Sequence, residues 1–113
     1  MNERDETLLR DMLNAARRAM AFMAGHDRDA LEADNQLLGY AVVRAIEIVG
    51  EAASKVSPET REQFPQIAWR QAVGMRNHII HDYLNVDYDI VWDVVSLNLP
   101  ELARELETIL TTK

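Results

Sequence analysis

Residues 75–83 read MRNHIIHDY and directly follow a glycine. Projected as a helix at about 100° per residue, this motif segment has one apolar arc and one polar arc. The apolar arc holds Met75, Ile79, Ile80 and Tyr83, with Arg76 at its centre, and the polar arc holds Asn77, His78, His81 and Asp82. A guanidinium is charged at any ordinary pH and is costly to bury alone. We therefore expect Arg76 to meet a carboxylate, a second subunit or an anionic ligand.

The two arcs together contain a cluster of Arg76, Asn77, His81 and Tyr83, the residue types that phosphoryl chemistry on RNA needs. Such chemistry takes a general acid or base with a near-neutral pKa, a cation for the charge of the phosphorane, and a polar group that orients the base. In a helix, Asn77 and His81 are four residues apart and therefore neighbours, so the amide can orient the imidazole. Arg76, Asn77 and His81 are thus the candidate catalytic residues.

Simpler interpretations of the same residues exist. An arginine on an apolar arc can lay its aliphatic part along the core or pair with a core carboxylate. His78 and His81, with Asp82 beside them, could hold a metal, but a zinc site takes three or four ligands. No third histidine is placed to complete one, and the chain has no cysteine. The sequence therefore predicts neither a metal site nor a cofactor.

Four blocks of the chain, in order, resemble a single known family. They are IEIVGEAASKVS (residues 46–57), PQIAWRQAVGMRN (65–77), GMRNHIIHDYLNVDYDIVW (74–92) and VWDVVSLNLPEL (91–102). Together they resemble the HepT-like family of the HEPN superfamily, small all-helical toxins that carry the pattern R-x-x-x-x-H-x-Y. Arg76, His81 and Tyr83 match that pattern, and Asn77 fills the polar position after the arginine. His78 departs from it, because another side chain often stands there.

The resemblance implies a metal-independent endoribonuclease that is the toxin of a type VII toxin–antitoxin pair of the HepT/MntA kind. His81 would be the general base for the ribose 2′-hydroxyl, Arg76 would stabilise the phosphorane, and Asn77 would hold the imidazole or the phosphate. The implied partners are RNA and a minimal nucleotidyltransferase antitoxin of the MntA type, which adds AMP to Tyr83. A second imidazole, His78, is a possible accessory group and leaves open which histidine is the essential base.

A homodimer is expected for two reasons. On a straight helix Arg76 and His81 point about 140° apart, so one copy makes an awkward site, whereas two motif segments across a two-fold axis could share one. The resemblance implies the same, because similar HEPN proteins are dimers with the motif at the interface. The alternative function is a non-catalytic helical dimer that only binds the nucleotidyltransferase or its nucleotide.

The composition limits the class of protein. The 113 residues, 48% of them apolar, fit one helical domain spanning residues 1–113. The lack of cysteine excludes a disulfide scaffold and fits a reducing cytoplasm. No apolar run reaches the length of a membrane span, and the acidic start MNERDE is unlike a signal peptide. The net charge of −7 disfavours a broad basic groove for nucleic acid, although only Arg70 and Arg76 are ionised between residues 65 and 81.

Apolar periodicity predicts an all-α fold, an up-and-down bundle of four main helices with short extra helical turns. The expected helices cover residues 3–24 and 35–56, a short segment that begins at Ser57-Pro58, the motif segment, and a last helix that starts at Asp87 and kinks or breaks at Pro100. No strand pattern is present.

The second helix contributes the carboxylates that could meet the motif segment. Arg44 and Glu47 are three residues apart and are expected to form a surface ion pair. Glu51, one turn further, could reach the helix that holds Arg76. Glu51 is therefore a second possible accessory residue.

Overall fold

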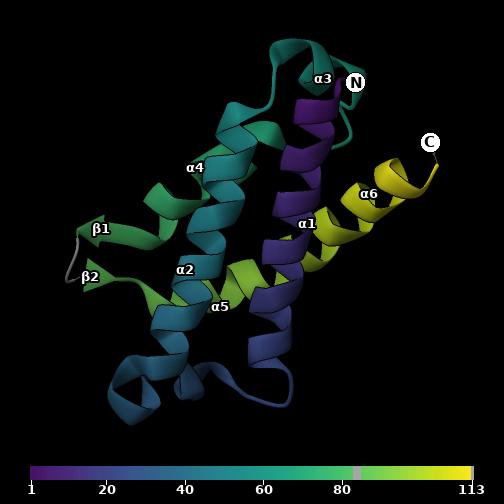
Figure 1. Cartoon of the computed structure of the whole chain (residues 1–113). Coiled ribbons are helices and arrows are strands. Elements are labelled where there is room, and N and C mark those ends of the chain that lie inside the picture. Colours follow the sequence, from purple (N-terminus) through teal and green to yellow (C-terminus); the bar gives the residue numbers. More distant parts are fainter. Residues whose placement is uncertain (83–84, 113) are drawn as a thin grey trace.

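The computed structural model describes residues 1–82 and 85–112. Its helices are α1 (Glu3–Met23), the short 3₁₀ helix η1 (Arg28–Glu32), α2 (Ala33–Lys55), α3 (Pro58–Gln63), α4 (Trp69–Ile79), α5 (Tyr88–Asp93), the π-helical turn η2 (Val94–Asn98) and α6 (Leu99–Thr111). The long helices α1 and α2 lie side by side, α4 packs against α2, and α6 packs against α1 (Figure 1). The expected all-α bundle is confirmed.

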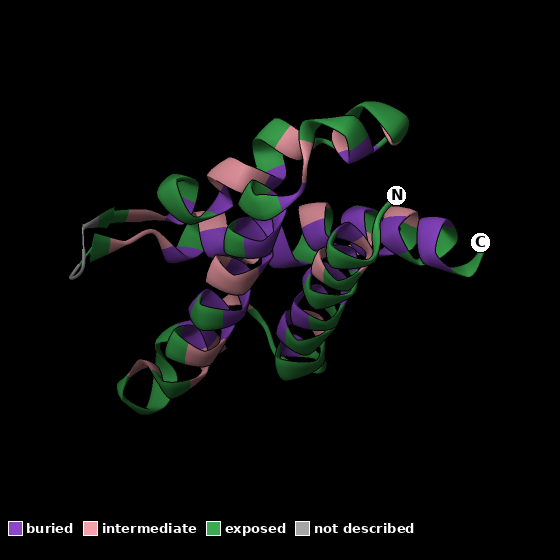
Figure 2. Cartoon of the chain, turned by 45° about the horizontal axis from the view of Figure 1, so that its top comes forward, coloured by how far each residue is buried: buried purple, intermediate pink, exposed green. Residues whose placement is uncertain are grey.

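The core lies between these helices because each of them has one apolar face. In α1 the buried positions recur every three or four residues, the spacing that puts side chains on one face: Leu9, Met12, Leu13, Ala16, Ala19 and Met23. The buried face of α2 contains Val42, Ala45, Ile46, Val49, Ala52 and Ala53. Its small alanine side chains allow a neighbouring helix to approach closely. Buried positions accordingly gather where the helices face one another (Figure 2).

The first residues of α2 are not in regular helical conformation. Residues 34–36 have positive φ angles of 50°, 56° and 65°, a left-handed conformation that costs roughly 1–2 kcal/mol for most residues. Shortly after, η1 and α5 meet α2 at Gly39, where a Cβ would lie 2.3 Å from the carbonyl oxygen of Leu31 and 2.7 Å from the ring of Tyr88. Because only glycine fits this contact, Gly39 positions the start of α5 beside α2.

The motif segment is helical only as far as Ile79, so the expectations that all of it is a helix and that the chain has no strands were wrong. Ile80 has an extended backbone (φ −117°, ψ 116°) and opens β1 (Ile80–Asp82), which pairs antiparallel with β2 (Asn85–Val86). The Asp87 amide also donates to the Ile79 carbonyl at 2.8 Å. These bonds form only after the chain has turned back, and two successive β-branched residues favour the extended form. The helical periodicity of the sequence therefore gave no sign of the hydrogen bonds between β1 and β2.

The kink or break expected at Pro100 takes the form of a π-helical turn, and the backbone stays helical from α5 into α6. Proline has no N–H to donate, and its ring would clash with the carbonyl one turn earlier. The helix opens into the wider π-helical turn η2, in which the Leu99 amide donates to the Val94 carbonyl. Helix α6 then begins with Pro100 in its first turn. From there α6 runs across α1 (Figure 1).

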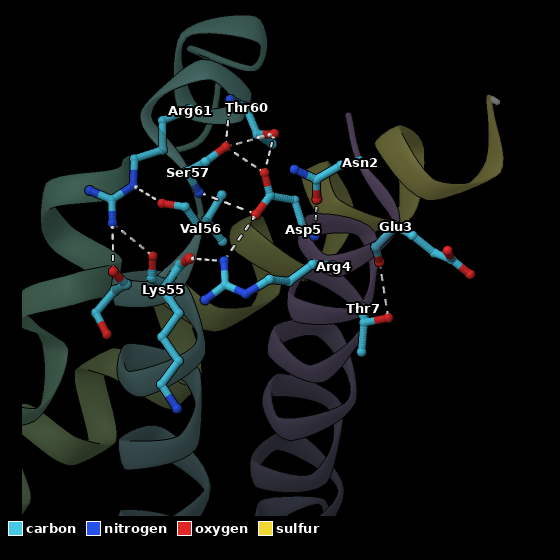
Figure 3. A network of polar contacts seen from close by, with 12 residues as sticks. Asn2, Glu3, Arg4, Asp5, Thr7, Lys55, Val56, Ser57, Thr60 and Arg61 are labelled. Carbon is cyan, nitrogen blue, oxygen red and sulfur yellow. Dashed lines mark hydrogen bonds and ion pairs between the residues drawn. The ribbon is translucent and has the colours of Figure 1, made fainter.

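A buried carboxylate joins the start of α1 to the start of α3. Asp5 is 0% exposed and accepts hydrogen bonds from Ser57 Oγ (2.5 Å), Thr60 Oγ1 (2.6 Å) and the Ser57 amide (3.2 Å). Figure 3 shows these contacts, with Arg4 nearby donating to the Lys55 carbonyl at 3.0 Å. Burial by itself raises the pKa of Asp5, but the hydrogen bonds from Ser57 and Thr60 outweigh it and lower this pKa below its ordinary value.

We expect Asp5→Asn to lower the free energy of unfolding at neutral pH by about 2 kcal/mol, because hydrogen bonds to a charged acceptor contribute about 1.5–3 kcal/mol. The folded-state pKa of Asp5 lies below the ordinary 3.8. Its stabilisation is therefore complete above that value and is lost as the pH falls through the folded-state pKa. Urea unfolding at about pH 7 and about pH 2 should show the difference between wild type and variant shrinking in acid.

The control for this prediction is Asp11→Asn, which removes an exposed carboxylate from the same helix. It should leave the free energy of unfolding within about 0.5 kcal/mol of wild type. Equal stabilities for the two variants would contradict the role given to Asp5.

Candidate functional site

A cleft of about 1030 Å³ lies where α2, the end of α4, the β-hairpin and the start of α5 meet. From α2 it is lined by Tyr40, Arg44 and Glu47, and from α4 and β1 by Arg76 and His81. The hairpin and the contact at Gly39 hold the other sides of this cleft in place. Segments far apart in the sequence thus converge on one open site.

Arg76 and His81 line the same cleft of a single chain. The divergence of about 140° expected for a straight helix does not apply, because the chain leaves the helix between these two residues. The geometric reason for sharing a site between two copies is therefore removed.

The carboxylate partner of Arg76 is Glu47, and the expectation of Glu51 was wrong. Arg76 Nε donates to Glu47 Oε2 at 3.0 Å, while the arginine side chain stays 54% exposed. A Cβ at Gly50 would lie 3.3 Å from a backbone carbonyl oxygen of α4, so the two helices touch at this glycine. Glu47, three residues earlier, shares that face of α2. Glu51, one helical turn further along α2, pairs with Lys55 at 3.6 Å and lines a pocket with residues of α1.

Arg44 does not form the expected ion pair with Glu47. The Glu47 carboxylate is engaged by Arg76, and within residues 1–82 and 85–112 Arg44 has no hydrogen bond or ion pair. Another arginine of the cleft, Arg28, is held by Glu32 and by Asp89 at 2.7 Å. Arg44 is therefore the arginine of this cleft whose donors remain open.

Asn77 and His78 are not among the residues that line the cleft. Asn77 is exposed, and its Oδ1 is 3.5 Å from Arg76 Nη1. It is on α4 while His81 is on β1, so the expectation that they are neighbours on one helix was wrong. His78 lines a separate pocket of about 240 Å³ together with Arg70. Tyr83 lies outside the described residues.

Two tyrosines of the cleft escaped the sequence analysis. Tyr40 is 67% exposed, and Tyr88 is buried. Burial, followed by the proximity of Tyr40 and Glu32, raises the pKa of Tyr88, so its ring is neutral. The signal that could have found Tyr40 is its spacing, four residues before Arg44 and seven before Glu47, which places all three on one face of α2.

The chemical groups of the cleft are therefore an imidazole, guanidinium groups, carboxylates and phenols. In the part of the chain that the structure describes, no three His, Cys, Asp or Glu side chains converge as a metal site would require. No helix in that part is long and apolar enough to cross a membrane.

The fold and the site define a small helical-bundle protein with an arginine and a histidine in one open cleft. The family model described as Ribonuclease HepT-like matches residues 12–109, which include every cleft residue from α2, α4 and β1. The chain belongs to the HepT-like ribonuclease family.

Three relatives carry related names. A protein of Methanocaldococcus jannaschii named "putative RNase" is 36% identical over 110 residues, which are 96% of this chain and 100% of the relative. A second "putative RNase" of that organism is 40% identical over 77 residues, covering 68% of this chain and 64% of the relative. A "probable ribonuclease HepT" of Thermococcus cleftensis is 36% identical over 70 residues, covering 62% and 64%. No solved structure matches the chain significantly.

Proposed function

We propose that the protein is a metal-independent endoribonuclease whose active site is the cleft lined by Arg76 and His81. The observation that carries this proposal is that one chain brings His81 and a Glu47-held Arg76 into the same cleft. Membership of the HepT-like ribonuclease family and relatives named as RNases support RNA as the substrate. The proposal includes the cellular role of toxin in a type VII toxin–antitoxin pair.

In the proposed reaction the His81 imidazole accepts the proton of a ribose 2′-hydroxyl, and the 2′-oxygen attacks the adjacent phosphorus. The bond from phosphorus to the 5′-oxygen then breaks. The products are a 2′,3′-cyclic phosphate and a 5′-hydroxyl that takes its proton from the imidazolium or from water.

Arg76 stabilises the charge that the phosphorane gains. Glu47 binds its Nε, which fixes the plane of the guanidinium and directs its other N–H groups toward the phosphate. Asn77, at 3.5 Å from Nη1, orients the same fork. The cation is thereby placed before substrate arrives, which is what electrostatic catalysis needs.

The test is cleavage of an end-labelled RNA by purified protein in EDTA, with product ends assigned by mass spectrometry. We expect cleavage without added metal and 2′,3′-cyclic phosphate ends. Cleavage that is lost in EDTA and restored by Mg²⁺ would contradict the mechanism. A folded protein that binds the nucleotidyltransferase or its nucleotide but cleaves no RNA would favour the non-catalytic alternative.

The proposal also includes the homodimer that the family resemblance implies. The mass by light scattering at micromolar concentration should be twice that of the chain, 12.9 kDa. An active monomer would contradict the dimer and leave the single-chain site intact.

Tyr83 provides a prediction about the antitoxin, a nucleotidyltransferase of the MntA type. If this partner silences the protein by adding AMP to Tyr83, the phenol oxygen is the acceptor, and the bulky anionic group would repel RNA. We expect Tyr83→Phe to keep ribonuclease activity but to escape the partner, so that cells expressing both proteins stop growing. Intact mass of the co-expressed wild type should increase in whole AMP units, mapped to the peptide containing Tyr83.

Tyr88→Phe is the control for this prediction, because it removes the hydroxyl of another tyrosine near the cleft. The Tyr88→Phe protein should still be modified and neutralised. An unmodified Tyr83 in a fully neutralised complex would mean that the antitoxin acts by covering the site.

A further inference from the structure

The cleft extends along α2 beyond the groups that the proposed reaction uses. Tyr40 and Arg44 line it together with Arg76 and His81, but neither has a part in breaking the bond. The two residues are one helical turn apart on the same face of α2, about 6 Å along its axis. They form a strip that leads from Glu47, the partner of Arg76, away from the reacting groups.

Arg44 is a cation kept available within an acidic protein. The chain has a net charge of −7, and the carboxylate nearest to Arg44 in sequence, Glu47, is held by Arg76 at 3.0 Å. In the described residues Arg44 therefore has no partner. An exposed guanidinium with open donors is suited to a phosphate, which it can bind with two parallel hydrogen bonds.

Tyr40 presents an aromatic ring whose surface is mostly exposed to solvent. Its side chain is 67% exposed, although it lines the cleft. Unpaired bases of RNA stack on aromatic side chains of this kind, and such stacking is tolerant of sequence because every base has a π-face. The Tyr40 ring and the Arg44 guanidinium, one helical turn apart, can therefore contact a base and a phosphate of the same single strand.

We propose that Tyr40 and Arg44 form a binding subsite for the nucleotide next to the cleaved phosphate, with its base on Tyr40 and its phosphate on Arg44. This subsite rests on the proposed ribonuclease function and specifies its substrate as single-stranded RNA. A base within a duplex has no free face to offer to Tyr40, and duplex RNA is recognised mainly by its shape.

The test measures binding and cleavage separately. Binding of a fluorescent single-stranded oligonucleotide with a 2′-deoxy residue at every position, which cannot be cut by this chemistry, is followed by anisotropy over a range of salt. We expect Tyr40→Ala to weaken binding about tenfold and Tyr40→Phe to stay within about twofold, because the ring is kept. Arg44→Ala should reduce the slope of log K against log salt by about 0.7, the contribution of one phosphate on a single strand.

Arg70→Ala is the matched control, since it removes an exposed arginine that lines the other pocket with His78. With ribo-oligonucleotides, the Tyr40→Ala and Arg44→Ala proteins should show a raised KM and a nearly unchanged kcat, and their masses by light scattering should equal that of wild type.

The Arg70→Ala control should bind and cleave RNA like wild type. If Tyr40→Ala and Arg44→Ala also bind and cleave RNA like this control, the subsite is wrong and the proposed ribonuclease function stands. If Tyr40→Ala instead dissociates the protein into monomers, this face is a contact between copies and the subsite is wrong. If wild type binds as described but cleaves no RNA, the ribonuclease proposal fails and the single-strand subsite holds.

Discussion

His81→Ala is expected to lower kcat for RNA cleavage by about 10³-fold, within the 10²–10⁴ that a positioned general base contributes. His81 is exposed, lines the cleft with Arg76, and belongs to a short strand rather than to the core. Its removal should therefore change the free energy of unfolding by less than about 0.5 kcal/mol. Single-turnover cleavage of a labelled oligonucleotide measures the loss, and urea unfolding checks the fold. The same variant should no longer inhibit growth.

His78→Ala is the control that separates the two histidines. His78 is also exposed and lies three residues earlier, but it lines another pocket. We expect its cleavage rate to stay within about threefold of wild type, because a surface change away from the cleft removes nothing that contacts substrate. A folded His81→Ala protein that cleaves at the wild-type rate would remove the mechanism. An inactive His78→Ala protein beside an active His81→Ala protein would move the active site to the other pocket.

The sequence predicted the helices well because their determinants are local. Asn2, Ser57 and Asp87 each accept a hydrogen bond from a backbone amide of the helix that they precede. Such caps, together with apolar spacing, can be recognised without knowing any neighbour. The β-hairpin could not be predicted in the same way, because Ile80 pairs with Val86 only after the chain has reversed.

The residue types of the site were also predictable, but their arrangement was not. An arginine in an apolar arc indicated that Arg76 needs a partner, and the structure provides a carboxylate. Which carboxylate it is depends on the register of two packed helices, fixed by the close approach at Gly50. A single sequence carries no direct signal for that register, so the sequence analysis assigned Glu47 to Arg44 and Glu51 to the helix of Arg76.

The second large effect is expected for Arg76. Arg76→Ala should lower kcat by about 10²–10³-fold, the loss measured when one donor to a developing oxyanion is removed. Arg76→Lys should recover little of this. Its single ammonium group can stay with Glu47 or turn to the phosphate, whereas the guanidinium binds Glu47 through Nε and has further N–H groups to donate to the phosphate. Single-turnover rates for both variants provide the measurement.

Glu47→Gln tests whether Glu47 acts by holding the Arg76 guanidinium in place or by the negative charge of its carboxylate. Glutamine can still accept the hydrogen bond from Arg76 Nε but cannot balance the charge of the guanidinium. The kcat of this variant should therefore fall by about tenfold or less. Light scattering on each variant shows whether a loss of rate follows a change of assembly. An Arg76→Lys protein as active as wild type would mean that a point charge suffices and that the fork held by Glu47 has no part in catalysis. If Arg76→Ala also retained full activity, stabilisation of the phosphorane would have to be assigned to another cation of the cleft. Among the described residues, Arg44 is the arginine of the cleft without a hydrogen bond or ion pair.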